Sequence, residues 1–231
     1  MAATSVVGAI VVAAGRSERM GGVVKPWAPI TDAAGRGRPL LAYPLAAFQA
    51  CAAIDGIVLV VAADAIERAH AVVREEGFDK VRVVVPGGGR RQDSVRAGLD
   101  ALDSCDVVVV HDGARPLVTR ELIERGIEAS QETGAACCAI PAPDTVKEAD
   151  DCRVVRTLDR SRLWLAQTPQ VFRYDLLIDA HGRYEGDATD DASMLEALGV
   201  EVRLYQGSPR NLKVTTPDDL DLVQALVAGA R

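Results

Sequence analysis

The chain has 231 residues, of which 48% are hydrophobic, 26% are charged and 4% are aromatic, and its formal net charge is −7. This length suits one large α/β domain or two small ones, and the composition is ordinary for a globular enzyme. An acidic, aromatic-poor chain argues against nucleic acid as a partner, because nucleic-acid surfaces are basic and often stack bases on aromatic rings.

The first predicted element is a strand at Val6–Val12, followed by the small residues Ala13, Ala14 and Gly15. Its apolar residues are continuous and not alternating, which is typical of a strand buried on both faces of a parallel sheet. No Lys or Arg precedes it, as a signal peptide would require, and no stretch approaches the roughly 18 apolar residues of a membrane span. We therefore expect no membrane partner.

The turn after this strand has the features of a phosphate site. Small residues allow a ligand to approach the backbone closely, and peptide N–H groups in such a turn can hold phosphate oxygens. Arg19 and Lys25 follow closely enough to fold back over a polyphosphate. The turn is neither a P-loop nor a dinucleotide GxGxxG fingerprint. The plain alternative is that small residues merely end a core strand and that the two cations are solvated.

The next part of the chain alternates between strand-like and helical segments. The predicted strands are 57–61, 81–85, 107–110 and 135–140, and the predicted helices are 40–53, 65–76, 92–102 and 120–132. This order predicts an α/β fold with a Rossmann-like, mostly parallel sheet flanked by helices. We expect one nucleotide-binding domain over 1–231, with residues 31–38 as a polar surface loop.

The alternation stops between Pro141 and Phe172, where charged and β-branched residues mix without a helical stripe. We interpret 141–172 as a protruding β-hairpin arm, and a hairpin alone is marginally stable in water, so another surface should cover it. Residues 211–213 are expected to form a strand before a final helix that begins at Pro217. The five cysteines, an odd number without a CxxC spacing, indicate reduced thiols and a cytoplasmic protein.

Six further blocks accompany the first turn along nearly the whole chain. They are Gly87–Val95, Val110–Pro116, Asp144–Lys147, Gln167–Phe172, Thr189–Ser193 and Asn211–Leu220. In this order the blocks resemble the cytidylyltransferases that act on sugar-alcohol phosphates. The first turn departs from that family's pattern at Ser17, often a second glycine, and at Val24 and Pro26, which flank Lys25 where the family usually has Pro-Lys.

The resemblance implies transfer of CMP from CTP to a small polyol phosphate, with 2-C-methyl-D-erythritol 4-phosphate as the favoured acceptor. Arg19 and Lys25 would be catalytic and would stabilise charge on the α-phosphate. The implied nucleotide-binding residues are Ala13, Ala14, Gly15, Arg16, Gly88, Arg91, Ser94 and Asp112. The attacking phosphate is already an anion, so positioning and charge neutralisation suffice for catalysis.

The same resemblance implies a second set of residues that bind the polyol phosphate. They are Asp112, Arg115, Thr145, Arg160, Thr168, Thr189 and Lys213. Asp112 is also a candidate for holding the ribose or Mg²⁺, and we expect Mg²⁺ to bind mainly through the CTP phosphates, without a dedicated protein metal site. Family members are homodimers whose arms clasp the partner subunit, so Thr145 and Arg160 are expected to serve the neighbouring site.

Two alternatives remain open at this stage. A sister enzyme that uses ribitol 5-phosphate or another polyol phosphate shares nearly every block. A catalytically silent nucleotide-binding module on the same scaffold is the other, since a fold alone does not establish an activity.

Overall fold

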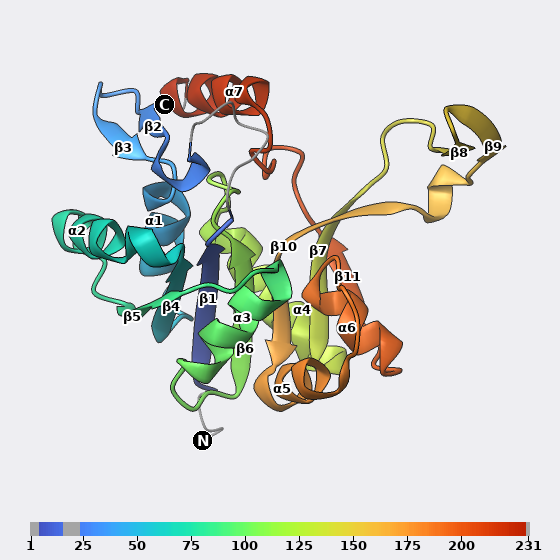
Figure 1. The fold of residues 1–231 in the computed structure, drawn as a ribbon, viewed down its shortest axis with the longest axis horizontal. Coiled ribbons are helices and arrows are strands. Elements are labelled where there is room, and N and C mark those ends of the chain that lie inside the picture. Colours follow the sequence, from blue (N-terminus) through green and yellow to red (C-terminus); the bar gives the residue numbers. More distant parts are fainter. Residues whose placement is uncertain (1–4, 16–23, 230–231) are drawn as a thin grey trace.

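The computed structural model describes residues 5–15 and 24–229. Their central feature is a 7-stranded sheet with the order β11-β7-β10-β6-β1-β4-β5 (Figure 1). Its strands are β1 Val7–Ala13, β4 Gly56–Val61, β5 Val81–Pro86, β6 Val107–Asp112, β7 Ala135–Pro141, β10 Trp164–Arg173 and β11 Arg203–Gln206. Only β10 runs against its neighbours. The predicted α/β class with a mostly parallel sheet is confirmed.

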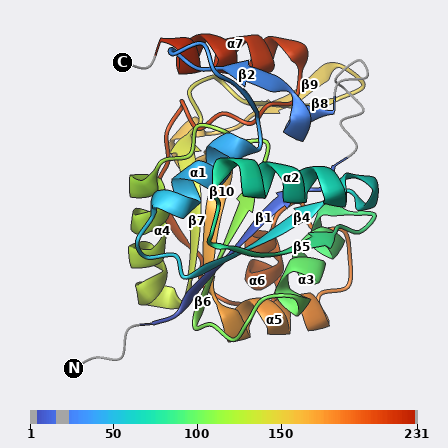
Figure 2. The ribbon, with the colours of Figure 1, turned by 90° about the vertical axis from the view of Figure 1, so that its left-hand side faces the viewer.

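Helices cover both faces of this sheet, as the parallel strands require because they are buried on both sides. The helices are α1 Ala42–Ala50, α2 Ile66–Glu76, α3 Arg91–Asp100, α4 Arg120–Thr133, α5 Tyr174–Arg183, α6 Asp191–Ala197 and α7 Pro217–Ala228. One core cluster packs α1, α2 and α4 on one face, and a second packs α3, α5 and α6 on the other. Figure 2 shows α4 to the left of the strands and α3, α5 and α6 at the lower right.

The helix boundaries follow local sequence signals. Gly77 and Gly134 end α2 and α4 in the left-handed conformation, with φ of 68° and 82°, which glycine adopts without steric cost. Thr216 and Asp219 form a capping box at the start of α7, next to Pro217 at its first turn. The four helices and five strands predicted in the first two thirds of the chain are therefore present, with bounds shifted by a few residues.

A small layer lies above the sheet, where α7 packs beside a short hairpin of β2 Pro29–Thr31 and β3 Gly37–Pro39 (Figure 2). The Gln224 side chain joins the two, since its Nε2 donates to the Thr31 carbonyl at 2.7 Å and its Oε1 accepts from the Thr31 N–H at 2.8 Å. The predicted surface loop 31–38 comprises the turn of this hairpin, the last residue of β2 and the first two residues of β3.

The predicted arm is shorter than expected. Its hairpin consists of β8 Lys147–Asp150 and β9 Arg153–Thr157, which stand away from the body in Figure 1. The last part of 141–172 instead forms β10 inside the main sheet, because Val171 and Phe172 are fully buried between β6 and β7. The expected strand at 211–213 is also wrong, since these residues have no regular structure. Among the described residues, no helix has the length and apolar character needed to cross a membrane.

Candidate active site

A cavity of about 160 Å³ opens at the edge of the sheet where the parallel strands end. The register brings Asp112, the last residue of β6, beside Val12 near the end of β1. In open α/β sheets, ligands bind at this carboxyl-terminal edge. The cavity is lined by Arg91, Asp112, Arg115, Ala166, Gln167, Thr168, Gln170, Thr189, Asp190 and Lys213.

Asp112 lies at the centre of a cluster of cations. Its Oδ2 is 2.8 Å from Lys213 Nζ and 3.9 Å from Arg115 Nε, and its Oδ1 accepts a hydrogen bond from Arg91 Nε at 3.0 Å. Burial opposes ionisation of this carboxyl group, but the charges of Arg91 and Lys213 outweigh it and hold the Asp112 pKa far below its usual range. Asp112 is therefore a carboxylate that fixes three cations around one point.

Arg91 has a second acidic partner beneath the cavity. Its Nη1 lies 2.6 Å from Oδ2 of Asp191, which is fully buried at the start of α6, and Asp191 Oδ1 lies 3.3 Å from His181 Nε2. Burial opposes ionisation of Asp191, yet the Arg91 charge outweighs it and lowers the Asp191 pKa. The two aspartates thus hold the Arg91 guanidinium from two sides.

The residues that line the cavity carry more positive than negative charge, although the whole chain is acidic. Three cations, Arg91, Arg115 and Lys213, line it against two carboxylates, Asp112 and Asp190. The Arg91 Nη2 and Arg115 Nε atoms are buried and have no hydrogen-bond partner among the described residues. The excess of positive charge among the lining residues suits an anionic ligand.

Thr168 lines the cavity, but its hydroxyl group is engaged within the protein. His111 Nε2 lies 3.1 Å from the Arg115 carbonyl, to which it must donate, so its Nδ1 accepts from the Thr168 hydroxyl at 3.0 Å. The same hydroxyl oxygen accepts the Asp112 N–H at 3.0 Å. Burial lowers the His111 pKa to about 4, so the imidazole is neutral. This chain of hydrogen bonds fixes the loop that carries Asp112 and Arg115.

The glycine-rich turn after β5 packs against the end of β1. A Cβ at Gly87 would lie 2.3 Å from Ala14 Cβ, so only glycine permits this approach. The Ser94 hydroxyl accepts the Gly88 N–H at 3.1 Å and donates to the Arg90 carbonyl at 3.2 Å. The two turns predicted to hold the nucleotide are therefore neighbours, and Ser94 shapes the second turn from inside.

Lys25 begins a short 3-10 helix, Lys25–Trp27, on the way from β1 to β2. Pro26 and Trp27 are buried, and the Arg68 guanidinium carbon lies 4.8 Å from the centre of the Trp27 ring. The backbone next to Lys25 is therefore anchored. Ala13, Ala14 and Gly15 lie at the end of β1 as expected, whereas Arg16 and Arg19 lie outside the described residues.

The structure does not bring Thr145 and Arg160 to this cavity. Both are exposed in the segments that flank the β8–β9 hairpin, where Arg160 Nη1 donates to the Pro143 carbonyl at 2.7 Å. Of the predicted residues, the cavity itself gathers Arg91, Asp112, Arg115, Thr168, Thr189 and Lys213.

Several polar residues of the site were missed by sequence reasoning. Gln167, Gln170, Asp190, Asp191 and Asn211 are all buried or half-buried around the cavity. All five lie inside the blocks noted above, and Asp190 also carries a helix signal, since its side chain accepts the Ser193 N–H at the start of α6. Buried polar groups need partners, but the sequence does not show which partners they find.

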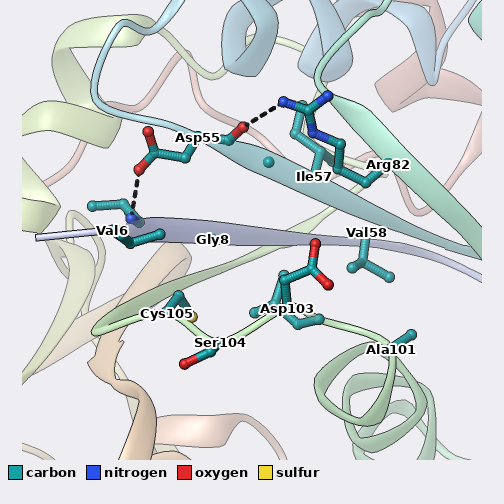
Figure 3. Close-up of a pocket in the computed structure, with 13 residues that line it drawn as sticks. Val6, Gly8, Asp55, Ile57, Val58, Arg82, Ala101, Asp103, Ser104 and Cys105 are labelled. Atoms are coloured by element: carbon teal, nitrogen blue, oxygen red, sulfur yellow. Dashed lines mark hydrogen bonds between the residues drawn. The ribbon is translucent and has the colours of Figure 1, made fainter.

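A second cavity, of about 200 Å³, lies at the opposite end of the strands (Figure 3). It is lined by the first residues of β1 and β4 and by the loop after α3. Its Asp55 carboxylate already accepts the Val7 N–H at 2.8 Å, and Arg82 donates to the Asp55 carbonyl at 3.3 Å. It contains none of the predicted site residues, so the smaller, positively charged cavity is the better candidate.

Comparison with known proteins gives matches along nearly the whole chain. The model of the 2-C-methyl-D-erythritol 4-phosphate cytidylyltransferase family matches residues 7–229. The chain is 44% identical over 226 residues to the protein of that name from Dehalococcoides mccartyi, covering 97% of each chain.

Two solved structures are also similar. The 2-C-methyl-D-erythritol 4-phosphate cytidylyltransferase from Thermus thermophilus is 34% identical, with a TM-score of 0.77, and 96% of this chain and 98% of that chain are covered. The 4-diphosphocytidyl-2C-methyl-D-erythritol synthase from Anaerococcus prevotii is 28% identical, with a TM-score of 0.81 and 96% of both chains covered.

Proposed function

The chain belongs to the 2-C-methyl-D-erythritol 4-phosphate cytidylyltransferase family, and from the geometry of its site we propose which residues carry out the transfer. The protein is a nucleotidyltransferase that transfers CMP from CTP to 2-C-methyl-D-erythritol 4-phosphate in isoprenoid biosynthesis. A phosphate oxygen of the acceptor attacks the α-phosphorus of CTP, the bond to the β-phosphate breaks, and pyrophosphate leaves. The chain therefore has to position two anions and neutralise their charge.

The observation that carries this proposal is the cluster of three cations around Asp112 next to two neighbouring turns. The turn after β1 and the turn Gly87–Gly89 hold CTP, with the triphosphate on the first and the cytosine at the second. Gly88, Ser94 and Arg91 shape the base end of the site. Arg19 and Lys25 stabilise the charge that develops on the α-phosphate, Arg19 by gripping two oxygens and Lys25 as a point charge.

The acceptor occupies the cavity on the other side of Asp112. Lys213, half-exposed at 40% and held 2.8 Å from the Asp112 carboxylate, grips its phosphate, and Thr189 at the cavity wall contacts its hydroxyl groups. Arg115 adds positive charge to the wall of the cavity. Steady-state rates with CTP and a panel of polyol phosphates test the acceptor, and 2-C-methyl-D-erythritol 4-phosphate is expected to give the highest kcat/KM. A higher value for ribitol 5-phosphate would contradict this assignment.

Replacing Lys213 by alanine is expected to raise the KM for the acceptor by about 10-fold to 100-fold, because a charged hydrogen bond to phosphate is lost. The KM for CTP should change by less than about twofold, since the nucleotide lies on the other side of Asp112. Initial rates measured with each substrate varied in turn give both constants. Equal increases in the two KM values would argue against this division of the site.

We propose that Mg²⁺ binds mainly through the CTP phosphates and adds positive charge at the reacting phosphate. Mg²⁺ commonly uses substrate phosphates and waters with few protein ligands. One observation supports this arrangement, since both Asp112 oxygens already face cations.

A homodimer joined through the arm is the proposed assembly. All residues of β8 and β9 are exposed, and Val154 and Val155 are 62% and 61% exposed on opposite faces of the hairpin. A lone hairpin with apolar side chains on both faces needs a cover, and a second copy of the chain supplies one. Thr145 and Arg160 would then complete the partner's acceptor site. The five unpaired cysteines support the cytosol as the place of action.

Replacing Val154 and Val155 together by aspartate is expected to weaken dimerisation by about 100-fold or more, because unpaired carboxylates would be buried in the interface. Sedimentation velocity over a range of concentrations measures this change, and activity should fall as monomer forms. Leu222→Asp is a matched control, since Leu222 is an exposed apolar residue on α7, far along the chain from the arm. A dimer of unchanged affinity in the double variant would refute the arm interface.

A further inference from the structure

Lys213 lies on a segment that belongs to no sheet or helix. Residues 207–216 link β11 to α7 without regular structure. The Gly207 N–H donates to the Ala139 carbonyl at 2.8 Å, and the Val214 N–H donates to the Ala114 carbonyl at 2.8 Å. Between these two points the backbone makes one turn, in which the Asn211 N–H donates to the Ser208 carbonyl at 3.0 Å, and side chains fix the rest of the segment that carries the Lys213 ammonium group.

Two buried amide side chains do so. Asn211 is fully buried, and its Nδ2 donates to the Thr168 carbonyl at 2.8 Å and to Gln167 Oε1 at 3.3 Å. Gln167 in turn grips Ser208, because its Nε2 donates to the Ser208 carbonyl at 3.0 Å and its Oε1 accepts the Ser208 N–H at 3.3 Å. A Cβ at Gly207 would lie 2.5 Å from the same oxygen, so glycine leaves room for the amide.

Arg115 also contacts the segment 207–216, through its guanidinium group. Its Nη1 donates to the Asn211 carbonyl at 2.8 Å, and its Nη2 lies 3.4 Å from the Ala166 carbonyl. The terminal nitrogens of this guanidinium are thus committed to backbone carbonyls, which differs from the direct substrate contact that the resemblance implies. Arg115 joins the segment of Lys213 to the first part of β10.

We propose that Asn211 is a positioning residue, which with Gln167 and Arg115 forms an amide clamp that holds Lys213 at the acceptor phosphate. A lysine side chain loses much rotamer freedom when it is fixed, so a mobile backbone beneath it would weaken its grip further. The ammonium group also needs a defined place, since it bridges Asp112 and the incoming phosphate. This inference rests on the proposed role of Lys213.

The clamp predicts a specific kinetic signature. Asn211→Leu, which keeps the approximate volume and removes the amide, should raise the KM for the acceptor by roughly tenfold and change the KM for CTP and kcat by less than about threefold. Arg210→Ala is the matched control, because Arg210 is an exposed cation on the same segment, and its constants should equal those of the wild type.

A double-mutant cycle separates positioning from a general structural role. If Asn211 acts through Lys213, then Asn211→Leu should have no further effect on the acceptor KM in the Lys213→Ala background. An equal effect in both backgrounds would overturn the proposal. Gln167→Met, which also removes the amide contact, provides the same comparison if Asn211→Leu does not fold.

The outcomes also distinguish this inference from the proposed function. An unchanged acceptor KM in Lys213→Ala would refute the role of Lys213, and the inference with it. A large effect of Lys213→Ala together with wild-type constants in Asn211→Leu would refute the clamp alone.

Discussion

Replacing Lys25 by alanine is expected to lower kcat by about 10²-fold to 10³-fold, the loss typical of removing one preorganised electrostatic donor. The same loss is expected for Arg19→Ala. The negative charge on the α-phosphate oxygens rises as the acceptor attacks. A fixed cation therefore stabilises the transition state more than it stabilises bound CTP. Lys25 meets this requirement because its 3-10 helix is anchored by the buried Pro26 and Trp27.

Pyrophosphate release at saturating CTP and acceptor measures this effect. The KM values should change little in comparison with kcat, since the interaction strengthens mainly in the transition state. Arg36→Ala is a suitable control, because the Arg36 side chain is 73% exposed and pairs with Asp32 in the β2–β3 turn. Wild-type turnover in either Lys25→Ala or Arg19→Ala would show that the residue has no such role.

Replacing Asp112 by asparagine is expected to have the second large effect. The change preserves shape but removes the negative charge that Arg91, Arg115 and Lys213 share. Breaking a buried ion pair by removing one partner leaves uncompensated charge, so the free energy of unfolding should fall by about 3 kcal/mol or more. Activity should fall as well, because the three cations lose the point around which they are arranged.

Urea denaturation at pH 7 measures the stability change. Asp103→Asn is the control, since Asp103 is an exposed carboxylate at the opposite end of the sheet, and its effect should stay within about 0.5 kcal/mol. Pyrophosphate should raise the unfolding midpoint of Asp112→Asn more than that of the wild type, because an anion replaces the missing charge. An unfolding midpoint equal to that of the wild type would contradict the central place of Asp112.

The parallel strands could be predicted because their burial on both faces makes them continuously apolar. β10 could not, since it is antiparallel and carries the buried polar residues Gln167, Thr168 and Gln170. Their mixed polarity is typical of an exposed segment, and only their partners in three dimensions make burial possible. The segment 211–213 was misjudged for the same reason, because side-chain amides replace the hydrogen bonds of a strand.

The residues of the site also divide into those that the sequence predicts and those that it does not. Asp112 could be placed at the ligand edge of the sheet because it follows a predicted strand, whereas Arg91 was a candidate only through the family resemblance. Asp191 and Asn211 were not predicted, because each acts through a partner far away in the chain, Arg91 and Thr168 respectively. Thr145 and Arg160 lie on the arm, and their role depends on a second copy of the chain.

The central claim is that the turn after β1, with Arg19 and Lys25, holds the reacting triphosphate. A crystal structure with bound CTP tests it most directly. We predict the triphosphate on that turn, the α-phosphate in contact with both side chains, and the cytosine beside Gly88. A nucleotide bound elsewhere, with Arg19 and Lys25 pointing into solvent, would contradict the account.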